Sequence, residues 1–152
     1  MDSDFETVYT VTDFWDGIRA GIADFNRHPH YYERQDEPRY EHDDAWVDIF
    51  FLKPIDNETF KLAIEDWEIW QRWHIAYQTG ETTVETHPAL PEDRARYVEI
   101  SEILTRRLVI HSDEAIKAEA EFKRDYSDIH PPQNGHATHP MAKISVKWHV
   151  VS

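Results

Sequence analysis

Residues 57–78 read NETFKLAIEDWEIWQRWHIAYQ, and this stretch decides the fold. It carries three of the six tryptophans of the chain. At 100° per residue, a helix over this range gathers its long charged residues into one arc of roughly 60°: Lys61, Glu65, Glu68 and Arg72. Apolar residues fill most of the remaining circumference. We therefore expect a central helix, against which the sheet and the other helices pack.

Two ionisable side chains interrupt the apolar sector of this helix. On the helical wheel Asp66 falls between Trp73 and Tyr77, and His74 falls beside Trp67. A polar group inside a buried sector needs a hydrogen-bonding or charged partner. Asp66 and His74 are about two turns apart along the helix and about 80° apart around it, so we expect them to have separate partners.

Composition predicts one globular domain over residues 1–152. Hydrophobic residues make up 40% of the chain and aromatic residues 13%, which excludes global disorder despite 30% charged residues. The chain has no cysteine, which excludes disulfides, thiolate metal sites and cysteine nucleophiles. Its acidic N-terminus lacks an apolar signal segment, and no apolar run reaches the roughly 20 residues of a membrane span. We therefore expect a cytoplasmic protein with no membrane contact.

The net charge of −14 is concentrated in the first third of the chain. Residues 1–56 contain 14 acidic and 5 basic residues, whereas residues 111–152 contain 6 and 5. Such a charge repels nucleic acid, which is bound through Lys and Arg contacts to phosphate. It favours a basic protein or a cationic small molecule as partner. The alternative is that the negative charge only keeps the protein soluble.

Strand-like segments dominate the first third of the chain and its end. They are Glu6–Trp15, Ile18–Phe25, His28–Arg34, Ala45–Leu52 and Ala142–Val151. The pairs Asp16-Gly17 and Asn26-Arg27 are typical of two-residue hairpin turns. We predict an antiparallel β-meander at the N-terminus, with the C-terminal strand joining the same sheet.

The middle of the chain is predicted to be helical. Asp56 or Asn57 caps the tryptophan-rich helix, and Gly80 follows its end. A second helix is expected over Glu92–Leu108 and a third from Ser112 or Asp113 to about Asp125. The predicted fold class is α+β, a meander packed against about three helices.

Ten histidines without any cysteine suggest a metal site. His28 and His30 are two residues apart, so in a strand both side chains point to the same face. A third and a fourth metal ligand would come from His42, Asp43 or Asp44. Two exposed histidines at a sheet edge are the alternative, and no cofactor is predicted.

Asp66 and His74 are the candidate catalytic residues. A carboxyl group buried beside tryptophans has a raised pKa, as a general acid does, but a structural ion pair or hydrogen bond explains the same burial. Aromatic rings around a carboxylate also suit a cationic ligand. The candidate lining residues are Trp67, Trp70, Trp73, Tyr32 and Arg19, and simple core packing is the alternative.

Known catalytic motifs are absent from the sequence: it has no GxSxG, Walker A, GxGxxG or HExxH pattern. The first hypothesis is therefore a small acidic interaction module whose acidic sheet region binds a basic protein, like an inhibitor or an immunity protein. The acidic residues of that region are Asp13, Asp16, Asp24, Glu33, Asp36, Glu37, Glu41, Asp43 and Asp44. The second is a ligand-binding domain or small enzyme with an aromatic pocket around Asp66 and His74. The sequence leaves enzymatic activity and oligomeric state open.

Overall fold

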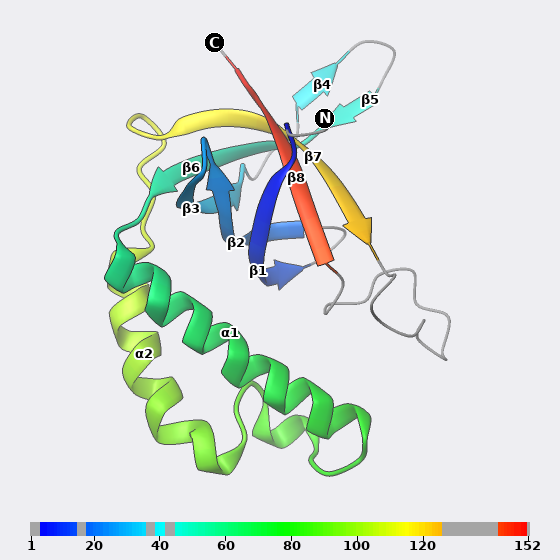
Figure 1. The fold of residues 1–152 in the computed structure, drawn as a ribbon, viewed down its shortest axis with the longest axis vertical. Coiled ribbons are helices and arrows are strands. Elements are labelled where there is room, and N and C mark those ends of the chain that lie inside the picture. The colour runs from blue at the N-terminus through cyan, green and yellow to red at the C-terminus, as the bar shows by residue number, and fades with distance from the viewer. Residues whose placement is uncertain (1–3, 15–17, 36–38, 42–44, 126–142, 152) are drawn as a thin grey trace. The chain divides into compact units, whose positions relative to one another are not determined.

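The computed structural model describes residues 4–14, 18–35, 39–41, 45–125 and 143–151. The chain divides into two compact units, one formed by Met1–Ile55 with Ile110–Ser152 and the other by Asp56–Val109. The strands belong to the first unit and the two long helices to the second (Figure 1). The predicted turn Asp16-Gly17 lies outside the described residues. The prediction of one globular domain stays a prediction.

Six antiparallel strands form a closed barrel in the first unit. They are β1 (Glu6–Phe14), β2 (Ile18–Phe25), β3 (His28–Arg34), β6 (Ile49–Pro54), β7 (Ile116–Asp125) and β8 (Lys143–Val150). The order around the barrel is β1-β2-β3-β6-β7-β8, and pairing of β8 with β1 closes it. Two short strands, β4 (Arg39–Glu41) and β5 (Ala45–Val47), form a separate hairpin.

The prediction of an open meander packed against about three helices is wrong in two respects. The sheet is closed, and the segment predicted as the third helix is strand β7, paired with β6 and β8. Its apolar residues alternate with charged ones: Ala118, Ala120 and Phe122 pack on the barrel core, whereas Glu119, Glu121 and Lys123 stand between them in the sequence. This period of two matches a strand with one buried face.

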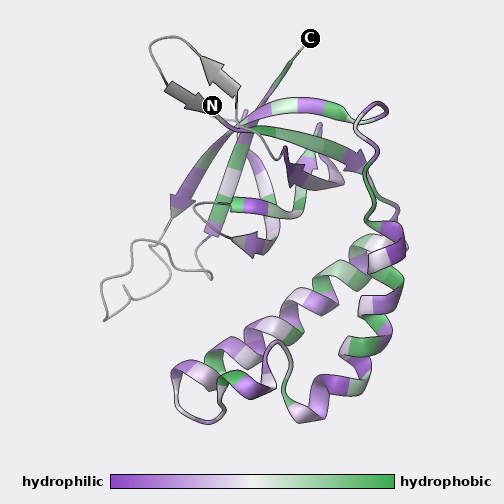
Figure 2. Ribbon diagram, turned by 180° about the vertical axis from the view of Figure 1, so that it is seen from behind, coloured by the Kyte–Doolittle hydropathy of each residue, from purple (hydrophilic) through white to green (hydrophobic). Residues whose placement is uncertain are grey.

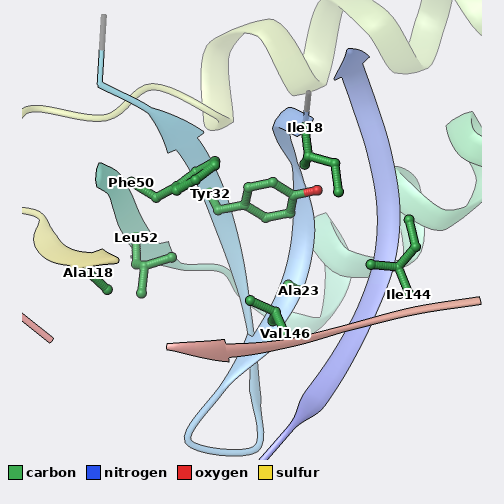
Figure 3. Packing of buried hydrophobic residues seen from close by; sticks show 8 residues of the cluster. All are labelled: Ile18, Ala23, Tyr32, Phe50, Leu52, Ala118, Ile144 and Val146. Carbon is green, nitrogen blue, oxygen red and sulfur yellow. The ribbon is translucent and has the colours of Figure 1, made fainter. Parts of the chain in front are cut away.

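Hydrophobic residues from the barrel strands form the main core cluster (Figure 3). Tyr32 is fully buried, and its ring centroid lies 5.7 Å from that of Phe50 and 6.0 Å from that of Trp148. Its hydroxyl donates a 2.9 Å hydrogen bond to the backbone oxygen of Thr10. The cluster and the residues packed against it come from the barrel unit, so helix α1, which we expected to be the hub of the fold, contributes none of them.

The turn between β2 and β3 agrees with the prediction. Asn26 and Arg27 have φ angles of 52° and 68°, the left-handed pair that a tight hairpin turn needs. The Glu6 carboxylate accepts hydrogen bonds from the backbone N–H groups of both residues, at 3.1 and 2.7 Å. Strand β1 therefore stabilises the turn of its neighbouring hairpin.

Two helices, joined by a connector, form the second unit. Helix α1 covers Asn57–Gln78, as predicted, and α2 covers Arg94–Arg107, with the 3₁₀ turns η2 (Val84–Thr86) and η3 (Pro91–Asp93) between them. Asp56 caps α1, because its carboxylate accepts a 2.8 Å hydrogen bond from the Thr59 N–H. Gly80, with φ of 80°, follows the C-terminus of α1. No helix in the described part of the chain is long and apolar enough to cross a membrane.

Candidate functional site

Helix α1 carries a ladder of three stacked rings, which we call the aromatic face: Trp67, Trp70 and His74. The centroids of Trp67 and Trp70 are 5.1 Å apart with planes 16° from parallel, and those of Trp70 and His74 are 4.8 Å apart at 14°. The spacings i, i+3 and i+7 place the three residues on one side of the helix. All three are half-buried.

A second ladder on α1 has a structural role. Trp73 stacks on Tyr77 at 5.1 Å and meets His87 edge to face at 4.6 Å. The Trp73 side chain is buried, and its indole N–H donates a 2.8 Å hydrogen bond to Thr86 Oγ1. Trp73 therefore anchors the connection after α1. The sequence offered no signal for this contact, because Thr86 and His87 lie in an irregular connector.

On the helical wheel Asp66 lies between Trp73 and Tyr77, the rings of the second ladder, and it precedes Trp70 of the aromatic face by one turn. Its side chain is half-buried, and it makes no hydrogen bond or ion pair with any residue that the structure describes. Burial raises the pKa of the Asp66 carboxyl above its ordinary value of 3.8. A partly dehydrated carboxylate in this position is stabilised by a cation placed next to it.

Three arginines of the helical unit bind carboxylates other than that of Asp66. Arg96 binds Glu65 through two hydrogen bonds of 2.6 and 2.8 Å, and Arg72 binds Asp93 through two of 2.9 and 3.0 Å. Arg107 binds Glu58 at 3.0 Å. These pairs join α1 to α2 or to the turn before it. The charged arc predicted on α1 is thus partly a contact surface for α2.

No match to this chain was found among protein-family models, curated proteins or solved structures.

Asp66 and His74 are not brought together as an acid–base pair. The His74 ring stacks on Trp70, and no hydrogen bond joins His74 to Asp66. This agrees with their 80° separation on the wheel. Their catalytic roles stay a prediction, and each would have to act with groups other than its counterpart.

Tyr32 and Arg19 belong to the barrel unit, whereas Asp66 and the tryptophans of α1 belong to the helical unit. Tyr32 is fully buried in the barrel core, and its hydroxyl is occupied by the bond to Thr10. Burial raises the pKa of that hydroxyl. Arg19 is half-buried on β2, between two buried residues. The part they were expected to play beside Asp66 stays a prediction.

His28 and His30 lie at the start of β3 in different environments. His28 is exposed, whereas His30 is buried, with its ring edge-on to Phe25 at 5.2 Å and Nδ1 2.8 Å from the His28 carbonyl oxygen. Within the described ranges no group of three or more His, Asp or Glu side chains is placed to hold a metal ion. The expected further ligands, at residues 42–44, lie outside those ranges, so the metal site stays a prediction.

Proposed function

We propose that this protein is a small acidic interaction module that binds a basic protein partner, in the manner of an inhibitor or an immunity protein. One observation carries the proposal. In the helical unit, Arg72, Arg94, Arg96 and Arg107 all bind acceptors within that unit, whereas the Asp66 carboxylate is left without a described partner. Four of the six basic residues of the unit are thus bound within it, and the negative charge of Asp66 remains available.

The charge distribution supports the same kind of partner. Residues 56–109 contain 11 acidic and 6 basic residues, so the helical unit shares the acidic character of the whole chain. Figure 2 shows hydrophilic residues along both α1 and α2. A negative electrostatic potential steers a basic protein toward the surface and increases the association rate. This increase becomes smaller as salt screens the charges.

The proposal is tested by affinity capture with the purified chain at two ionic strengths. Raising the ionic strength from about 0.01 M to about 0.15 M shortens the screening length from about 30 Å to about 8 Å. We expect capture of a basic protein at low salt, and weaker binding of that protein, once purified, as salt rises. Capture of no basic protein at low salt, or binding insensitive to salt, would refute the proposal.

Binding of a cationic small molecule is the second candidate, and the position of Asp66 among aromatic rings favours it. Rings and a carboxylate together recognise quaternary ammonium groups. Isothermal titration with choline and with its neutral isostere, 3,3-dimethylbutan-1-ol, separates this possibility from general attraction of apolar groups. Equal heats for the charged and neutral compounds would exclude it. An enzymatic role for Asp66 and His74 would need a substrate bound at the same place.

A further inference from the structure

The aromatic face has the properties of the centre of a protein interface. Trp67 and Trp70 are half-buried, and neither indole N–H donates a hydrogen bond to a residue that the structure describes. In contrast, the indole groups of Trp73 and Trp148 are bonded to Thr86 Oγ1 and to a backbone oxygen. Tryptophan combines a large apolar surface with one donor, which makes it common among the residues that dominate binding energy.

Stacking prepares these rings for binding. Each ring of the aromatic face is held nearly parallel to the next, at 5.1 and 4.8 Å. Side chains already fixed in one arrangement lose less conformational entropy when a partner covers them. The half-buried rings of Trp67 and Trp70, whose indole N–H groups have no acceptor among the described residues, therefore form a preformed surface.

Asp66 determines what kind of partner fits this surface. It precedes Trp70 by one helical turn, and its half-buried carboxylate has no described partner. A second copy of this chain would bring another net charge of −14 to the surface, which opposes self-association. A partner with a cation at this point would supply the missing charge and is therefore complementary.

We infer that the basic partner docks on the aromatic face of α1, and that one of its Lys or Arg side chains pairs with Asp66 while its apolar residues cover Trp67 and Trp70. This inference rests on the proposed function. It goes further by naming the docking surface and the ion pair at its edge. A docked partner would also supply acceptors for the two free indole N–H groups.

The first experiment follows the indole N–H resonances of the ¹⁵N-labelled chain, assigned through Trp→Phe variants, during titration with the purified basic protein from the capture experiment. We expect the Trp67 and Trp70 resonances to shift and those of Trp73 and Trp148 to stay in place, because the latter two donors are already bonded. If the partner binds without moving the Trp67 and Trp70 resonances, the inference is overturned and the proposed function stands.

The second experiment compares two variants with the same change in charge. Glu102 on α2 is exposed and makes no described hydrogen bond or ion pair, so Glu102→Gln is the matched control for Asp66→Asn. We expect Asp66→Asn to weaken binding about tenfold or more and Glu102→Gln by about twofold or less. Equal losses in the two variants would mean that only the overall charge matters, and would overturn the inference.

Controls separate the remaining outcomes. Asp66→Asn removes a partly dehydrated charge, so we expect the variant to fold at least as well as the original chain, as thermal unfolding will show. Trp70→Phe keeps a ring and removes the donor, and it should weaken binding without unfolding the protein.

Failure of the original chain to capture any basic protein would refute the proposed function itself. Sedimentation that reveals a dimer broken by Trp70→Phe would identify a second copy as the occupant and overturn the inference.

Discussion

At Gly21 strands β1 and β2 approach each other too closely for a side chain, and Gly21→Ala tests this directly. An alanine Cβ at this position would lie 2.1 Å from the Thr10 backbone oxygen and 2.6 Å from the Tyr32 hydroxyl. Rotation of a side chain cannot relieve the first contact, because the Thr10 oxygen belongs to the backbone of β1. Strands β1 and β2 would have to separate locally.

The magnitude follows from two separate costs. Overpacking a core costs about 1–3 kcal/mol, and the shift would also break the 2.9 Å hydrogen bond from Tyr32 to Thr10, which costs about 1–3 kcal/mol when a buried group loses its partner. Together these costs lower the free energy of unfolding of Gly21→Ala by about 2–6 kcal/mol. Urea unfolding followed by circular dichroism measures this value.

Tyr32→Phe provides the control in a double-mutant cycle. It removes the hydroxyl, and therefore the 2.6 Å contact, but leaves the contact with the Thr10 oxygen. Alone, it should cost about 1 kcal/mol through loss of one hydrogen bond. Gly21→Ala should remain strongly destabilising in the Tyr32→Phe background. A change below about 0.5 kcal/mol for Gly21→Ala, within the range of ordinary surface substitutions, would refute the close approach of β1 and β2 at this point.

Three further predictions concern stability. Burial raises the pKa of Asp66 above its ordinary value of 3.8, so its charged form destabilises the fold. Asp66→Asn should therefore increase stability at pH 7, and this gain should decrease as the pH falls and vanish well below pH 3.8, where the carboxyl is protonated in both the folded and the unfolded state. Equal gains in urea titrations at both pH values would contradict this. Asp56→Ala should lower the melting temperature measured by circular dichroism, whereas Asp56→Asn should retain the cap on α1; equal losses would mean that the cap is unimportant. Asn26→Gly should change the free energy of unfolding by less than about 0.5 kcal/mol, because both residues tolerate a φ of 52° and the hydrogen bond from the residue 26 backbone N–H to Glu6 is kept. A loss in urea unfolding larger than this would show that the Asn26 side chain stabilises the turn.

Local elements were predictable where the pattern of residues is local. The bounds of β2, β3 and α1 agree with the prediction, as do the turn at Asn26-Arg27 and the cap at Asp56. Each depends on neighbouring residues: alternation for a strand, a capping side chain for a helix, and a residue that tolerates positive φ for a turn. Tertiary contacts reinforce these preferences and do not reverse them.

Closure of the barrel could not be predicted from such local patterns. It depends on the pairing of β8 with β1 and of β7 with β6, between segments far apart in the sequence. Strand β7 was also mistaken for a helix, because Ser112 and Asp113 are typical capping residues and Glu and Lys favour helices. The alternation of Ala118, Ala120 and Phe122 with charged residues contained the correct signal. With β7 taken as a helix, the sheet lacked the strand that closes it.

The candidate site shows the same limit. The helical wheel correctly separated Asp66 from His74 and placed Asp66 near Trp70 and Trp73. It could not show that Trp73 would be buried through Thr86, while Trp70 would stack on its own neighbours along α1. Nor could it show that Arg96 would reach across from α2 to Glu65. Both distinctions depend on which element packs on which side of the helix.

These contacts divide helix α1 into residues that stability requires and residues that it does not. Trp73, Glu65 and Arg72 hold α2 and the connector, so substitutions there should affect folding first. Asp66 contributes no described bond and bears a charge that burial disfavours, so stability alone gives no reason for an aspartate at this position. A variant that folds better and binds worse would therefore identify Asp66 as a residue retained for binding.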